Sequence, residues 1–134
     1  MKLLLAAFLA AHALIHASYL TPAPPRTAGG PELPFDLARS WLVTAVGLDP
    51  RAVRAIGIAL VAGTLILLLA AAMATAGWWV VPSHWWPVLL VSGAGSSLLT
   101  LTIFFRPWLL LGFAIDAGLL WAVFGGWRPT ALGV

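Results

Sequence analysis

Residues 55–105 read AIGIALVAGTLILLLAAAMATAGWWVVPSHWWPVLLVSGAGSSLLTLTIFF, and no charged side chain occurs between Arg54 and Arg106. A helix needs about 20 apolar residues to cross the hydrocarbon core of a bilayer, so this stretch is long enough for two crossings. The segment in its middle, residues 77–87, carries four tryptophans and two prolines. That composition is typical of a turn at the membrane boundary. The stretch therefore predicts membrane spans over residues 53–76 and 86–105.

Apolar segments also lie on both sides of this stretch. Residues 3–20 read either as a secretory signal peptide or as a first span; two histidines make a poor signal core, so we expect a retained span. Residues 108–125 form a fourth apolar segment. Only 8% of the 134 residues are charged, against about 25% in soluble domains. The sequence predicts an all-α integral membrane protein, with residues 1–134 forming a single transmembrane domain of four helices in an antiparallel bundle.

The connection between the first and second spans divides into two parts. Residues 21–34 contain five of the ten prolines together with Gly29 and Gly30, which predicts a loop. Residues 35–47 then show apolar side chains at three- and four-residue spacing, with Asp36 as a plausible helix cap. This segment is too short to span a membrane. We expect a short amphipathic helix at the interface.

Charge and cysteine content exclude several classes of protein. The seven basic residues are spread thinly along the chain, which argues against nucleic-acid binding. Without cysteine there is no disulfide framework, thiolate nucleophile or Cys-ligated metal. The composition suggests a bacterial cytoplasmic membrane protein. The connections after the first and third spans carry Arg26, Arg39, Arg51, Arg54 and Arg106, and the opposite face carries Lys2 and Arg128. The positive-inside rule then places both termini on the non-cytoplasmic side.

The eight tryptophans supply a second topological prediction. Tryptophan is enriched where a helix leaves the hydrocarbon core. We expect one group to mark one interface, and Trp41 and Trp108 to mark the other. The first group consists of Trp78, Trp79, Trp85, Trp86 and Trp127.

Polar residues inside the spans are costly in hydrocarbon and therefore informative. His12, Ser97 and Asp116 each lie eight or nine residues from the same face of the predicted bundle. At about 1.5 Å per residue they lie roughly 12 to 14 Å deep. Gly63 and Thr64 of the second span fall near the same depth. The sequence thus predicts a polar centre shared by the helices.

Asp116 gives the sharpest signal. An ionised carboxylate near the middle of the membrane costs at least about 3 kcal/mol. It needs either a proton or a partner, and we expect it to face the bundle interior near His12 or Ser97. Its role is either structural, fixing how the helices pack, or functional, as a proton or ligand site.

His12 and His16 are four residues apart, so both project from one helix face, with Tyr19 one turn further on. They can be structural, can contact a substrate or relay a proton, or can bind a metal or tetrapyrrole. A metal site requires further ligands, and Asp116 could supply a third. His84 is expected at the opposite interface. The predicted ligand-binding or proton site is His12, His16, Tyr19, Ser96, Ser97 and Asp116, and the predicted metal ligands are His12, His16 and Asp116.

Small and polar residues form stripes on the third span (Ser92, Ser96 and Thr100, beside Gly93 and Ser97) and on the second (Ala55, Ala59 and Gly63). Close packing between these two helices is the favoured interpretation. The alternative is a Ser-His-Asp hydrolytic site, because all three residue types fall at one depth.

In the number and length of its helices the chain resembles small bacterial four-span proteins of the DoxX type, a resemblance that extends to no motif or site residue. We expect an accessory subunit of a membrane complex or a binder of a lipophilic small molecule. The alternatives are a metal- or tetrapyrrole-ligating protein and an intramembrane lipid-modifying enzyme. Membrane lipid, other membrane subunits or a second copy of the chain are the expected partners.

Overall fold

The chain forms helices joined by short turns. The computed structural model describes residues 2–21, 35–37 and 40–126. Four long helices make up most of this part: α1 (Lys2–Ser18), α3 (Pro50–Ala76), α4 (Trp86–Ile103) and α5 (Leu110–Phe124). The short helix α2 (Trp41–Val46) precedes α3, and the 3₁₀ turns η1 (Ser83–Trp85) and η2 (Pro107–Leu109) precede α4 and α5. The all-helical prediction is confirmed for the described residues.

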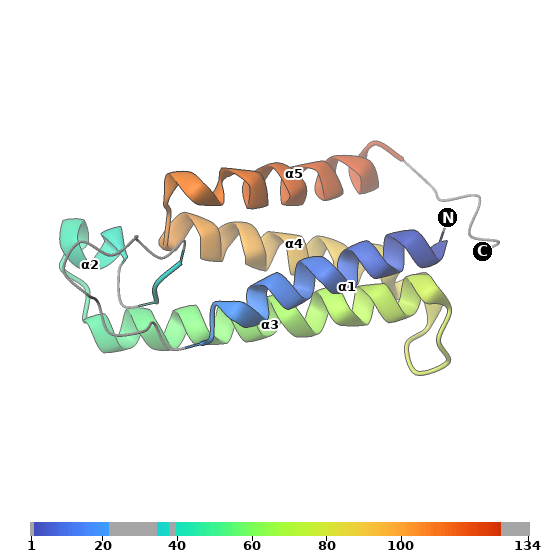
Figure 1. Cartoon of the computed structure of the whole chain (residues 1–134), viewed down its shortest axis with the longest axis horizontal. Helices are drawn as coiled ribbons and strands as arrows, with labels where there is room; N and C mark the ends of the chain where they lie inside the picture. The colour runs from blue at the N-terminus through green and yellow to red at the C-terminus, as the bar shows by residue number, and fades with distance from the viewer. Residues whose placement is uncertain (1, 22–34, 38–39, 127–134) are drawn as a thin grey trace.

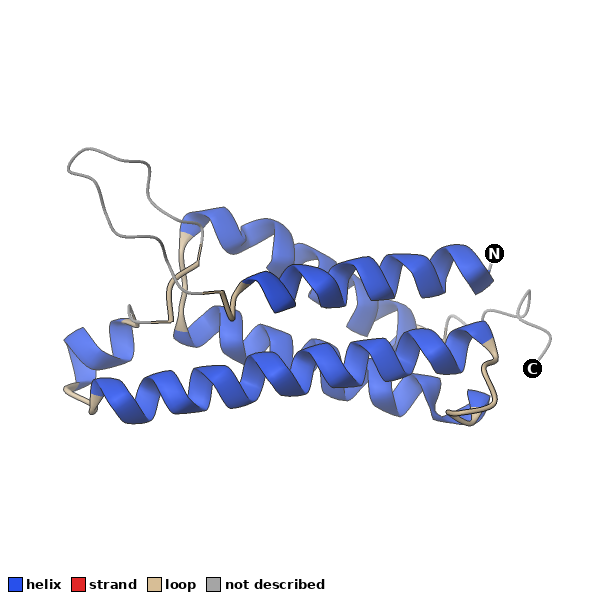
Figure 2. Ribbon diagram, turned by 60° about the horizontal axis from the view of Figure 1, so that its bottom comes forward, coloured by secondary structure: helices blue, strands red, loops and turns tan. Residues whose placement is uncertain are grey.

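The long helices lie side by side, and each runs in the opposite direction to the one before it (Figures 1 and 2). α3 packs against both α1 and α4, and α5 packs against α4. α1 and α5, the first and last of these long helices, are joined by a hydrogen bond between His12 and Asp116. The arrangement is the antiparallel one that short connections favour.

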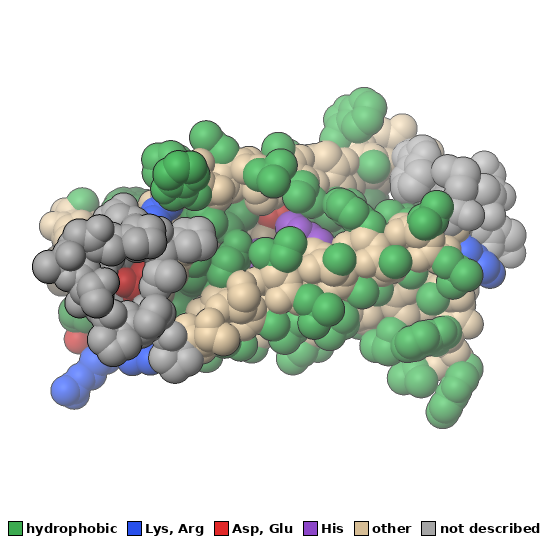
Figure 3. Space-filling view, in the orientation of Figure 1, with side chains coloured by type: hydrophobic (Ala, Val, Ile, Leu, Met, Phe, Trp, Pro, Cys, Tyr) green, Lys and Arg blue, Asp and Glu red, His purple; other side chains and the backbone are tan. Residues whose placement is uncertain are grey.

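Three helical segments are long and apolar enough to cross a membrane: residues 50–76, 83–103 and 107–124. α1 is also apolar, but it has only 17 residues. On the face seen in Figure 3, many apolar side chains lie on the surface between the ends of the bundle. The exposed ones include Leu4, Ile66, Val88, Leu111 and Phe124. Such a surface is compatible with integration into a membrane.

The helix ends follow local capping rules. α3 begins at Pro50, three residues earlier than predicted, because the carboxylate of Asp49 accepts hydrogen bonds from the backbone N–H groups of Arg51 and Ala52. It ends at Ala76 as predicted, with Gly77 in the left-handed conformation at φ 78°. α1, α4 and α5 each end one or two residues before the predicted limit.

The segment predicted as an interfacial helix over residues 35–47 is shorter. α2 covers only Trp41–Val46, and its N-cap is Ser40, not Asp36. The Ser40 hydroxyl accepts from the N–H of Leu42 and donates to the carbonyl of Ile103 in α4. Phe35 is buried and stacks on Tyr19, so residues 35–37 are held by tertiary packing in a non-helical conformation. Residues 22–34, where the loop is predicted, lie outside the described part.

The described tryptophans that were predicted to mark the interfaces lie at the two ends of the bundle, and Trp121 lies within α5. Trp78, Trp79, Trp85 and Trp86 lie at the connection between α3 and α4. Trp41 donates from its indole N–H to the carbonyl of Thr102 near the other end of α4, where Trp108 also lies. This grouping agrees with the prediction, although Trp127 lies outside the described residues.

Two hydrophobic clusters fill the interior, one toward each end. The first is centred on Leu9, Ala13, Leu68, Ala71, Ala72 and Leu90, and the second on Phe35, Val53, Val61, Leu101, Phe104 and Leu109. Along each long helix a buried polar residue lies between residues packed in the two clusters: His16 on α1, Thr64 on α3, Ser97 on α4 and Asp116 on α5. The predicted polar layer is therefore present.

Candidate metal centre

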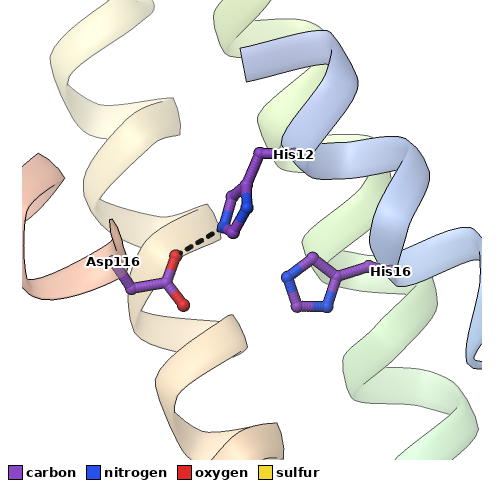
Figure 4. A group of neighbouring side chains, drawn as sticks. All are labelled: His12, His16 and Asp116. Atoms are coloured by element: carbon purple, nitrogen blue, oxygen red, sulfur yellow. Dashed lines mark hydrogen bonds and ion pairs between the residues drawn. The ribbon is translucent and has the colours of Figure 1, made fainter. Parts of the chain in front are cut away.

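Three of the four long helices contribute hydrogen-bonded side chains to the polar layer. His12 and His16 lie one turn apart on the buried face of α1, Ser97 lies on α4 and Asp116 on α5. Figure 4 shows both imidazoles pointing from α1 toward the Asp116 carboxylate. Within α5, as the structure describes it, only Asp116 is buried, and its side chain is 0% exposed. α5 thus reaches the centre of the bundle with one acidic side chain.

The four side chains form a continuous hydrogen-bonded chain. His12 Nε2 lies 2.9 Å from Asp116 Oδ1, which joins α1 to α5. The Ser97 hydroxyl donates to Asp116 Oδ2 and lies 3.0 Å from His16 Nε2. The expectation that Asp116 faces inward, within hydrogen-bonding distance of His12 or Ser97, is confirmed, and both residues bind it.

This order of contacts determines the direction of each hydrogen bond when Asp116 is ionised. A carboxylate only accepts, so His12 donates from Nε2. The single proton of Ser97 goes to Asp116, and therefore His16 donates from Nε2 to the Ser97 oxygen. Both neutral imidazoles then carry their proton on Nε2, and each Nδ1 carries a lone pair.

Three buried polar side-chain atoms among the described residues have no hydrogen-bonding partner: His12 Nδ1, His16 Nδ1 and Thr64 Oγ1. Buried polar atoms are usually paired, so an unpaired set concentrated in one layer calls for an explanation. The sequence predicts the depth of Thr64 but gives no reason to include it in the site. Its burial and its unpaired hydroxyl are properties of the folded bundle.

His12, His16 and Asp116 can each place one ligand atom within 4.8 Å of the others. Within the described residues this is the one such group of histidine and carboxylate side chains. In a tetrahedral site with metal–ligand bonds of about 2.0–2.2 Å, neighbouring ligand atoms lie about 3.4 Å apart. The ligand atoms must therefore move together by up to about 1.4 Å, which is within reach of side-chain rotation. Two imidazole nitrogens and a carboxylate oxygen suit zinc and other divalent first-row metals.

The remaining predicted site residues lie outside this hydrogen-bonded chain. Tyr19 makes an edge contact with the His16 ring, at 5.2 Å between ring centroids, but it stacks on Phe35 in the second hydrophobic cluster. Ser96 donates to the Leu60 carbonyl of α3 at 3.1 Å. This bond agrees with the favoured interpretation of close packing between the second and third predicted spans. His84 is exposed in η1, at the far end of the bundle from α2.

The order of contacts argues against a Ser-His-Asp hydrolytic site. In such a site one histidine lies between the serine and the carboxylate. Here Ser97 lies between His16 and Asp116, while the carboxylate is bonded to the other histidine, His12. Ser97 is also fully buried. The hydroxyl orients its neighbours and is not placed as a nucleophile.

A tetrapyrrole also fits poorly. His12 Nε2 is in direct hydrogen-bonding contact with the carboxylate, and His16 Nε2 with the Ser97 hydroxyl. A macrocycle needs an open plane in front of an axial nitrogen. A single metal ion would take the place of the Nε2 protons, with each imidazole then carrying its proton on Nδ1. The geometry favours a metal ion.

Comparison with known proteins adds no assignment. No family model matches the chain, and no match was found among curated proteins or solved structures. Function must therefore be argued from the site itself.

Proposed function

We propose that this protein is a four-span membrane protein that binds one divalent transition-metal ion through His12, His16 and Asp116. α1 serves as the fourth span in this proposal. Its 17 residues extend over about 26 Å, slightly less than the 30 Å hydrocarbon core, and a short span is accommodated by local thinning of the bilayer. α1 packs along α3 and exposes Leu3, Leu4 and Leu14 on its outer side.

The observation that carries the proposal is the convergence of three metal-ligating side chains in a buried layer. The ligands come from helices at opposite ends of the sequence, so their meeting is a property of the fold. Burying an ionisable residue in a membrane protein is costly, and a bound cation compensates the carboxylate. Metal binding explains why an aspartate and two histidines share one site.

The other predicted functions depend on further molecules that the site itself does not identify. An accessory subunit would bind its partner through the apolar outer surface. A protein that contacts only lipid would have a similar surface, so this surface does not distinguish the two. A binder of a lipophilic molecule would need that molecule to reach the layer from the bilayer. The metal proposal is compatible with both and can be tested on the isolated chain.

The test is metal content and affinity of the protein purified in a neutral detergent. We expect one Zn²⁺ or Co²⁺ per chain, measured by elemental analysis after desalting and by calorimetric titration. The nearly isosteric changes His12→Gln and Asp116→Asn should each weaken affinity by at least about 10-fold, because loss even of an outer-shell partner costs that much. His84→Gln, a histidine change outside the cluster, should leave affinity unchanged.

Helix content by circular dichroism and a single peak in gel filtration must be retained by each variant. If the wild-type chain binds no metal in equimolar amount, or if only His84→Gln weakens binding, the proposal is wrong.

A further inference from the structure

We propose that the bound metal takes as an additional ligand the carboxylate of a long-chain lipophilic acid, which enters from the bilayer between α1 and α5. This inference rests on the metal site proposed above. It names the class of molecule that completes that site.

The first argument is charge. Asp116 is the only acidic residue in the described parts of the four long helices, since Asp49 caps α3 from outside and Asp36 precedes α2. A divalent ion bound by one carboxylate and two neutral imidazoles leaves a net charge of +1. An unbalanced charge in a low-dielectric interior is strongly unfavourable. One further anion makes the site neutral.

The second argument is coordination. Three protein ligands leave at least one position open on a four-coordinate metal, which is the arrangement of catalytic and ligand-binding sites rather than of closed structural ones. The Ser97 hydroxyl is already engaged by Asp116 and His16, and as a neutral group it does not supply the missing charge. The additional ligand must come from outside the described residues.

The third argument is access. Figure 3 shows histidine and carboxylate atoms between apolar side chains on the face between α1 and α5. His12 is 4% and Asp116 0% exposed, so a ligand that enters there must displace the apolar side chains around them. Phe8, one turn before His12, is 45% exposed and stacks parallel to the His12 ring at 6.3 Å between centroids. It lies beside the route to the site. A ligand that arrives between two lipid-facing helices needs an apolar body, and the metal selects an anionic head.

The experiment uses Co²⁺-loaded protein in a neutral maltoside detergent. Palmitate, hexadecanol and acetate are added separately at equal concentration, and the visible absorption of Co²⁺ is recorded, because its band positions and intensities report the ligand set. We expect palmitate to change the spectrum and to saturate at one molecule per chain. Hexadecanol should leave the spectrum unchanged, and acetate should bind at least about 10-fold more weakly because it lacks the apolar chain.

Two variants test the route of entry. Phe8→Trp enlarges the side chain beside His12 and should weaken palmitate binding at least 10-fold without changing Co²⁺ affinity. Leu14→Trp changes an exposed residue on the other side of α1 and should have no effect. If Co²⁺ binds but palmitate leaves its spectrum unchanged, or if acetate binds as well as palmitate, this inference is wrong while the metal proposal stands. Absence of Co²⁺ binding overturns the metal proposal itself.

Discussion

The Ser97 hydroxyl connects His16 and Asp116, which form no hydrogen bond with each other. It donates to Asp116 and lies 3.0 Å from His16 Nε2, so the imidazole of α1 and the carboxylate of α5 are coupled through α4. Because a hydroxyl has only one proton, this coupling fixes the tautomer of His16 as well as its position. In the metal-free chain this tautomer has its proton on Nε2, so a metal that binds His16 through Nε2 requires the remaining proton to move to Nδ1.

The most informative residue for a mutational test is Thr64, whose buried hydroxyl has no partner. Thr64→Val keeps the shape and removes the unpaired group, so it should raise the free energy of unfolding by about 1 kcal/mol. When a metal binds through Nε2, each histidine carries its remaining proton on Nδ1 and needs an acceptor. The Thr64 hydroxyl bonds neither Nδ1 in the metal-free structure. If it becomes that acceptor when the metal binds, the same change should lower metal affinity about 10-fold. Denaturant unfolding and Zn²⁺ titration measure the two effects.

The matched control is Thr75→Val on the same helix. Thr75 is also buried, but its hydroxyl donates to the Ala71 carbonyl at 2.7 Å. We expect neither a gain in stability nor a change in metal affinity. A Thr64→Val variant with unchanged metal affinity would show that this hydroxyl plays no part in orienting the histidines.

The sequence predicts which polar residues share the layer but not how they pair. Depth follows from the constant rise of a helix, so His12, Ser97 and Asp116 can be placed at one level without a structure. Pairing depends on the rotation of each helix about its axis, which packing decides. Ser96 and Ser97 are neighbours in sequence, yet one bonds the α3 backbone and the other the carboxylate. Depth alone places both serines in the site, whereas only Ser97 bonds the carboxylate.

At the scale of elements, α3 approaches the end of α4 most closely at Gly57, where there is no room for a side chain. A Cβ atom added to Gly57 would lie 2.5 Å from Phe104 Cζ, and Phe104 is buried in the second hydrophobic cluster. Gly57→Ala should therefore separate the two elements and lower the free energy of unfolding by about 1–3 kcal/mol. Detergent-based unfolding followed by tryptophan fluorescence measures it.

Gly63→Ala, six residues further along α3, provides the comparison. There the nearest atom to an added Cβ is Ser96 Oγ at 3.8 Å, an ordinary contact. Alanine favours helix over glycine by about 1 kcal/mol, so stability should stay level or rise. Equal losses for the two variants would contradict the packing seen at Gly57.

The long helices were predictable because each is a long apolar run bounded by glycine, proline or tryptophan. The segment before α3 was not. Its apolar spacing fits a helix over residues 35–47, but Phe35 gains more by burial against Tyr19 and Phe104 than by continuing a helical turn. Tertiary packing of this kind overrides local periodicity. Asp49 and Pro50, which follow the predicted helix and precede the predicted second span, cap and begin α3.

At the scale of the whole molecule, the polar layer divides the interior into two apolar halves. Each half is held by close packing of leucine, alanine, valine and phenylalanine side chains. The layer between them is held by hydrogen bonds that join α1, α4 and α5. α5 packs mainly against α4, so the bond between His12 and Asp116 contributes a specific connection to α1. A metal bound there would join the first and last helices of the chain directly.

The absence of cysteine makes the proposed topology directly testable. Single changes Leu3→Cys and Trp79→Cys label one end of the bundle, and Thr21→Cys and Leu48→Cys label the other; all four positions are exposed. Because Arg51, Arg54 and Arg106 lie at the Leu48 end, the positive-inside rule places that end in the cytoplasm. A membrane-impermeant maleimide added to intact cells should therefore modify Leu3→Cys and Trp79→Cys, and should reach the other two only after permeabilisation. Modification of Leu3→Cys and Thr21→Cys from the same side would show that α1 does not cross the membrane. The reverse pattern at all four positions would show that the charge rule gives the wrong orientation for an otherwise correct bundle.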